Sequence, residues 1–82
     1  MIKGEKQMDD AILVDVRGLK CPLPVLKTAR RMSQHPAGSR FLVRATDPLA
    51  AIDVPHFCSE NGHRLLASGR EGDELVFDIE KG

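Results

Sequence analysis

Cys21 is the residue of this chain best suited to chemistry, because it lies where a strand-like segment gives way to a helix-like one. The surrounding residues 15–24 are DVRGLKCPLP. We expect Cys21 to be the N-cap of that helix, where the partial positive charge of the helix terminus favours a thiolate over a thiol. Arg17 and Lys20 add positive charge nearby. The segment predicts a reactive thiol; the alternative is a structural cysteine beside a helix-starting proline.

The residues around Cys21 also shape the backbone that presents it. Pro22 and Pro24 preset the backbone angles of a first helical turn, although they delete two N–H donors. Gly18 follows Arg17 at the end of the preceding strand and belongs to the same supporting group. The two prolines argue against a phosphatase-type loop, which needs successive N–H groups to hold a phosphate. A dithiol oxidoreductase is disfavoured as well, because the chain has no C-x-x-C pair.

The second cysteine, Cys58, shares a predicted helical stripe with Val54, Phe57 and Asn61. This position predicts a core-facing side chain, since free cysteine often packs as a small hydrophobe. The alternative is a resolving thiol or a second thiol that bears sulfur. We expect no metal site, because His56 and Cys58 would point about 200° apart on a helix.

Composition limits the classes of function. The chain has 82 residues, with twelve basic and twelve acidic residues, no Trp, no Tyr and three Phe. Zero net charge and few aromatic rings argue against binding of nucleic acid. No apolar run approaches the roughly 20 residues needed to cross a membrane. We expect a flexible tail over 1–10, a single domain over 11–82, and a cytoplasmic protein with reduced thiols.

The hydrophobic pattern predicts six elements in the order β-α-β-α-β-β. They are a buried strand over 11–16, a helix over 22–34, a strand over 40–46, a helix over 53–61, and strands over 63–68 and 74–80 joined by the loop 69–73. Right-handed crossovers would put both helices on one side of the sheet. We therefore expect an α/β (α+β) two-layer sandwich with a mixed four-stranded sheet, its last strand antiparallel to its hairpin neighbour.

Three local patterns place side chains on these elements. The first helix has a predicted inward stripe of Pro22, Val25, Leu26, Ala29 and Met32, and predicted outward residues Lys27, Thr28, Arg31 and Gln34. Its basic residues Lys27, Arg30 and Arg31, together with Asp47, form a candidate docking surface for a partner; the alternative is an ordinary solvated face. Asp47-Pro48 and Asp53-Val54-Pro55 both resemble helix starts, and we expect the helix to follow the second signal and to stop at Gly62.

The segment D-x-R-G-L-x-C-P-x-P around Cys21 resembles the TusA, or SirA-like, family of sulfur carrier proteins. The likeness extends through Ala45–Pro48 and Asp53–Cys58 to Gly62-His63, and covers residues 13–80. The resemblance implies a fold like the C-terminal domain of bacterial translation initiation factor three. It also implies that Cys21 accepts sulfur as a persulfide from a cysteine desulfurase or rhodanese and passes it to an acceptor protein, without a metal or organic cofactor.

The resemblance leaves the pathway open among three branches of the family. Sulfur ends in the 2-thio group of a tRNA wobble uridine in one branch, and serves sulfur oxidation or molybdenum-cofactor enzymes in others. Lys20 stands where the family commonly has Arg. Two other functions remain as alternatives: a non-catalytic regulatory or RNA-associated binding module, and a thiol redox protein, which would need Cys58 near Cys21.

Overall fold

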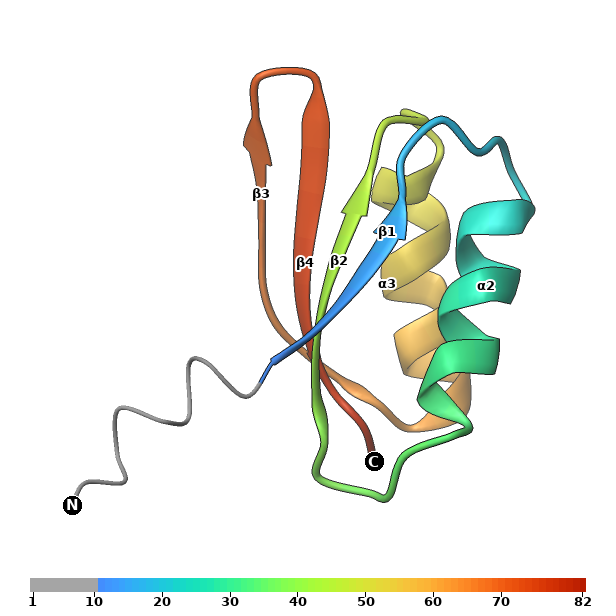
Figure 1. The fold of residues 1–82 in the computed structure, drawn as a ribbon, viewed down its shortest axis with the longest axis vertical. Helices are drawn as coiled ribbons and strands as arrows, with labels where there is room; N and C mark the ends of the chain where they lie inside the picture. The colour runs from blue at the N-terminus through green and yellow to red at the C-terminus, as the bar shows by residue number, and fades with distance from the viewer. Residues whose placement is uncertain (1–10) are drawn as a thin grey trace, which may run out of the picture.

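The computed structural model describes residues 11–82, and the predicted tail over 1–10 lies outside them. The elements are β1 (Ile12–Val16), α2 (Leu23–Met32), β2 (Arg40–Ala45), α3 (Ala50–Asn61), β3 (Arg64–Glu71) and β4 (Glu74–Glu80). Both helices cover one face of a four-stranded sheet (Figure 1). The predicted element order and the two-layer α+β architecture are therefore confirmed.

The sheet is mixed, as the sequence predicts. Its strand order is β1-β2-β4-β3, with β1 and β2 parallel and the other two pairs antiparallel. The parallel pair needs a crossover connection, which α2 provides, whereas β3 and β4 are joined directly as a hairpin. Because the ends of parallel strands meet at the same edge of a sheet, the segments that follow β1 and β2 emerge together (Figure 1).

The core lies between this sheet and the two helices. On β2 and β4 every second residue is buried, so that Phe41, Val43 and Ala45 pair with Ile79, Phe77 and Leu75. This confirms the faces that alternation predicts for these two strands. The core is completed by Val14 and Val16 from β1, Met32 from α2, and Val54, Phe57 and Cys58 from α3. Complete burial of one such side chain contributes about 1.5–3 kcal/mol.

Two predictions about strands are wrong in detail. The run at 11–16 does not form a buried strand, because β1 is at the sheet edge and the helices cover one face only. Its Leu13 is 53% exposed while Val14 is buried. The hairpin is longer than predicted, since β3 continues to Glu71 and the loop 69–73 shrinks to the turn Gly72-Asp73. Gly72 has a φ of 61°, which glycine adopts without strain, so the strands can pair up to the turn.

The first helix is shorter than predicted and rotated about its axis. It spans Leu23–Met32, and its buried residues are Pro24, Thr28 and Met32, one turn apart. Thr28 is therefore inside rather than outside, and Leu26 is 57% exposed rather than inside. The prediction sorted these residues by polarity, but a threonine is small enough to pack against the sheet when its neighbours on the stripe do.

The second helix starts three residues earlier than predicted. It begins at Ala50, after the Asp47-Pro48 signal, so Pro55 lies inside the helix instead of in its first turn. Pro55 lacks an N–H and so removes a single hydrogen bond of the helix. The predicted end is confirmed at Gly62, which has a φ of 74°, while the His63 N–H donates to the Cys58 carbonyl at 2.9 Å.

Candidate functional site

Cys21 is exposed and lies in the loop between β1 and α2. The sequence predicts that Cys21 is the N-cap of the helix, and this prediction is wrong. The N-cap is Pro22, and no side chain caps the helix terminus. The N–H groups that a capping thiol would need are not free. The Leu23 N–H donates to the Lys20 carbonyl at 2.8 Å, and Pro24 has no N–H. The thiol is therefore left at the surface without a capping role.

Asp47 connects the backbone of Cys21 to the segment that starts α3. One carboxylate oxygen accepts a hydrogen bond from the Cys21 N–H at 2.7 Å, and the other accepts from the Leu49 N–H at 3.1 Å. These two N–H groups lower the pKa of Asp47, since they stabilise its charged form. Asp47 was predicted as a docking residue; that role stays a prediction, whereas its contact positions Cys21.

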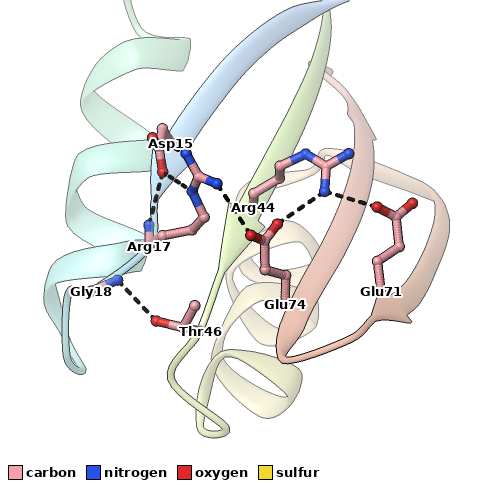
Figure 2. Close-up of polar contacts among 7 residues, drawn as sticks. All are labelled: Asp15, Arg17, Gly18, Arg44, Thr46, Glu71 and Glu74. Atoms are coloured by element: carbon pink, nitrogen blue, oxygen red, sulfur yellow. Dashed lines mark hydrogen bonds and ion pairs between the residues drawn. The ribbon is translucent and has the colours of Figure 1, made fainter.

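A second contact joins the same two loops. The Gly18 N–H donates to the Thr46 hydroxyl at 2.8 Å (Figure 2). Gly18 has a φ of 82°, so a glycine avoids backbone strain at this bend. The sequence analysis did not identify Thr46 as a site residue. Its position directly after β2, the strand parallel to β1, is the signal that could have indicated it. The segment leading to Cys21 is thus held by two consecutive residues, Thr46 and Asp47.

The structure directs Arg17 toward carboxylates. Its guanidinium donates to both oxygens of Asp15 at 2.9 Å and to Glu74 at 3.1 Å. Glu74 also accepts from Arg44 at 3.0 Å, and Arg44 reaches Glu71 at 3.0 Å (Figure 2). Asp15 and Arg44 alternate with buried neighbours, so this chain of ion pairs lies on the sheet face that the helices leave open.

The electrostatic environment of Cys21 is opposite to the one predicted. The pKa of its thiol is raised, first by hydrogen bonding to the Asp53 side chain, then by desolvation and by the negative charges of Asp53 and Asp47. Arg17 and Lys20 were expected to favour the thiolate, but neither is among the groups that shift this pKa. Asp53 lies in the first turn of α3 and was missed as a site residue. The fold therefore brings a carboxylate, and not a cation, to the sulfur.

A groove of about 340 Å³ opens beside Cys21, between the two helices. It is lined by Cys21, Pro22 and Val25 on one side, and by Asp53, His56, Phe57, Glu60 and Asn61 on the other. Phe57 is almost completely buried and Val25 is half-buried, so they form an apolar floor. His56 and Glu60 are exposed, and the His56 Nε2 atom lies 3.9 Å from the Glu60 Oε2 atom. The thiol is thus at the end of a groove with an apolar floor and polar walls.

The basic side of α2 lies next to a different surface. Lys27, Arg30 and Arg31 are exposed, as predicted. Lys27 and Arg30 line a shallow pocket with Leu23 and Leu26, whose side chains are 50% and 57% exposed. Leucine side chains beside cations suit contact with another protein. The docking role of these residues stays a prediction.

The second cysteine is placed as predicted. Cys58 is 2% exposed, and burial raises the pKa of its thiol. Within residues 11–82, no group of three or more His, Cys, Asp or Glu side chains is arranged to hold a metal ion. A separate point concerns membranes: none of the helices within residues 11–82 is long and apolar enough to span one.

Comparisons with known proteins agree on one family. The model of the family described as Sulfurtransferase TusA matches residues 12–81. The sulfur carrier protein TusA of Pseudomonas putida is 39% identical over 72 residues, which are 88% of this chain and 89% of its own. YrkI of Bacillus subtilis is 39% identical over 70 residues, which are 85% of this chain and 93% of its own. YrkF of the same organism is 35% identical over 75 residues, and the match covers 40% of that longer protein.

Proposed function

The chain belongs to the TusA sulfurtransferase family and is a sulfur carrier, and we propose that Cys21 is the residue that holds the sulfur, as a persulfide. The position of this thiol is the observation that supports the proposal most. Cys21 is exposed in the loop before α2 and borders an open groove, whereas Cys58 is buried. A carrier must be reached by two proteins in turn, and a buried thiol would not allow that.

The proposed chemistry consists of two balanced transfers. The Cys21 thiolate attacks the outer sulfur of a persulfide on the donor protein, a cysteine desulfurase or a rhodanese. A new S–S bond forms to Cys21, the donor S–S bond breaks, and the donor cysteine leaves as a thiolate. The acceptor thiolate then attacks the outer sulfur on Cys21; a new S–S bond forms to the acceptor, the S–S bond at Cys21 breaks, and Cys21 leaves as a thiolate. Because each transfer exchanges one S–S bond for another, no metal or organic cofactor is needed.

Anchoring of the loop supports this role. Asp47 holds the Cys21 N–H, Thr46 holds the Gly18 N–H, and Pro22 restricts the backbone that follows. A thiol presented in one direction loses little freedom when a partner docks, which favours transfer. We propose that the chain is a relay in the cytoplasm rather than a stand-alone catalyst. The sulfur would go to tRNA thiolation, sulfur oxidation or molybdenum-cofactor enzymes.

The test is a loading experiment with intact-mass detection. The chain is incubated with a cysteine desulfurase, pyridoxal phosphate and cysteine, and we expect one added sulfur that a reductant removes. Cys21→Ser should gain none, while the matched variant Cys58→Ser should still be loaded. If Cys21→Ser gains the same reducible sulfur, or if the unmodified chain gains none from any desulfurase or rhodanese tried, the proposal is wrong.

A further inference from the structure

The groove beside Cys21 is lined by two carboxylates and one histidine, His56. Asp53 and Glu60 are on its wall, and none of the residues that line it is Lys or Arg. Elsewhere in residues 11–82 the carboxylates of Asp15, Glu74 and Asp78 form ion pairs with arginine. No ion pair within that range uses Asp53. On this acidic wall Glu60 has His56 beside it at 3.9 Å, whereas the described residues offer Asp53 no ion-pair partner.

The floor of the groove has a different character. Pro22, Val25 and Phe57 add apolar surface to the lining of the groove. Long basic side chains combine the two features that would complement such a site, because an aliphatic stem covers apolar surface while the charged end reaches a carboxylate. A volume of about 340 Å³ accommodates one side chain of this kind, but not a folded segment.

We propose that this groove receives a lysine or arginine side chain of the protein that gives sulfur to Cys21 or takes it away. The cation pairs with Asp53, Glu60 adds negative charge about two turns further along α3, and the stem lies on Val25 and Phe57. The basic residue therefore lies close to the reactive cysteine of that partner, since both must reach the same end of the groove. This inference rests on the proposed function, because it assumes that Cys21 is the sulfur-bearing residue.

Pairing at Asp53 would also change the reactivity of the thiol. In the free carrier the Asp53 carboxylate raises the pKa of Cys21, with a smaller effect of Asp47. His56 and Glu60 are the other titratable groups of the groove. A cation placed on Asp53 compensates the negative charge that opposes thiolate formation. Docking of the correct partner would thereby activate the thiol, and the resting carrier would stay less reactive.

The test uses two small disulfides of opposite charge. Cystamine is cationic and dithiodiglycolate is anionic; each forms a mixed disulfide with Cys21 and releases its other half as a thiol. Exchange rates are measured by intact mass at low salt, and each is divided by the rate with the neutral model thiol N-acetylcysteinamide. We expect a normalised preference for cystamine of about five-fold or more, because two charges at contact distance interact by about 1 kcal/mol even in water.

Matched variants assign the preference to the groove. Asp53→Asn should bring the ratio close to one, and Glu60→Gln, at an exposed position, should lower it. Asp73→Asn removes the same charge from the hairpin turn, outside the groove, and should keep the ratio. A change in thiolate fraction cancels in the ratio, since it affects both probes equally. High salt should reduce the preference.

Two results would overturn the inference: a normalised ratio near one in the unmodified chain, or a preference that both groove variants retain. Sulfur loading by a desulfurase is scored separately. A chain that takes sulfur on Cys21 without preferring cystamine contradicts the groove inference alone. A chain that prefers cystamine but is never loaded contradicts the proposed function.

Discussion

At the scale of single residues, the pair Cys21 and Asp53 is the main feature of the site. The carboxylate raises the pKa of the thiol, so that a larger share of Cys21 is protonated at neutral pH than in a free cysteine. The thiolate is the nucleophile in sulfur exchange. The proposed pairing of Asp53 with a basic side chain of the partner would offset this effect on the thiol.

Replacement of Asp53 tests this effect. Asp53→Asn should lower the pKa of Cys21, because the amide removes the negative charge of the carboxylate beside the thiol. Labelling by iodoacetamide should then reach half of its maximal rate at a lower pH, and should be several-fold faster at neutral pH. Cys58 serves as the internal control, since a buried thiol should be labelled only after unfolding. An unchanged or upward-shifted profile would contradict the assigned role of Asp53.

A second single-residue prediction concerns the core. The Thr28 side chain is completely buried, and its hydroxyl has no hydrogen-bond partner within residues 11–82. An unsatisfied buried polar group costs about 1–3 kcal/mol. Thr28→Val keeps the branched shape and should raise the thermal midpoint, by about 4–8 °C for each kcal/mol recovered in a domain of this size.

The control for that prediction is Thr28→Ser, which keeps the hydroxyl and loses a methyl group. This variant should lower the midpoint. Thermal unfolding followed by circular dichroism measures both. If the valine variant melts earlier than the unmodified chain, the hydroxyl has a stabilising partner and the prediction fails.

At the scale of elements, two helices meet Cys21 with surfaces of different charge. The exposed side of α2 carries Lys27, Arg30 and Arg31, while the groove wall on α3 carries Asp53 and Glu60. A partner that contacts both surfaces would be oriented by them, since complementary potentials set the direction of approach and suppress incorrect encounters. Under the proposed function, the two helices would therefore give an approaching partner a direction, in addition to supporting the thiol.

Asp47 carries the element-level prediction. It joins the loop after β1 to the start of α3, through the Cys21 N–H and the Leu49 N–H. Asp47→Ala should lower the thermal midpoint and slow sulfur loading, because both N–H groups lose their acceptor and the thiol loses its fixed direction. Asp47→Asn keeps one side-chain oxygen, so its thermal midpoint and loading rate should lie between those of Asp47→Ala and the unmodified chain. Loading kinetics equal to those of the unmodified chain would exclude a positioning role for Asp47.

At the scale of the whole molecule, long-range ion pairs connect strands that are distant in sequence. Arg17 links the end of β1 to Glu74 at the start of β4, and Arg44 continues the chain to Glu71. A single exposed ion pair contributes little to the stability of the fold. In a network, one side chain that is already ordered takes part in several pairs, so each pair costs less conformational entropy. The open face of the sheet is therefore organised by charge, whereas the other face is organised by apolar packing.

These charges predict how stability depends on pH. The pKa values of Asp15, Asp47 and Glu74 are lowered in the fold by hydrogen bonds to Arg17 and to backbone N–H groups. A carboxyl group whose pKa is lowered in the fold contributes its full stabilisation at pH values above its ordinary pKa of 3.8 to 4.5. This contribution is lost as the pH falls through the pKa of the group in the folded state. Burial lowers the pKa of His63 below 6.5, which adds a loss at milder acidity.

We therefore expect the thermal midpoint to decrease gradually below a pH of about 6.5 and steeply below about 4. Thermal scans across the acidic range measure this. Arg17→Met should lower stability near neutral pH and flatten the steep part, because two of the three carboxyls lose a partner. A midpoint that stays constant down to pH 3 would show that these pairs do not act on stability.

Much of the fold follows from patterns that are local in sequence. The alternation of apolar and polar residues along β2 and β4 determines which side chains face the core. Gly62 ends α3, because its backbone is left-handed and few residues other than glycine adopt that conformation. The burial of Cys58 follows from its helical stripe. The motif around Cys21 resembles the TusA family, and the family match over residues 12–81 confirms that membership.

Tertiary structure alone decided the surroundings of the thiol. Arg17 is four residues before Cys21 in sequence, but it pairs with Asp15 and with Glu74. Glu74 comes from a strand near the other end of the chain, and the parallel and antiparallel pairings bring these strand ends together. Asp53 and Asp47 reach Cys21 through the packing of α3 beside α2. Periodicity reports which face of an element is apolar, but not which distant charge will lie beside a given side chain. The sign of the charge beside the sulfur therefore depended on how the elements pack.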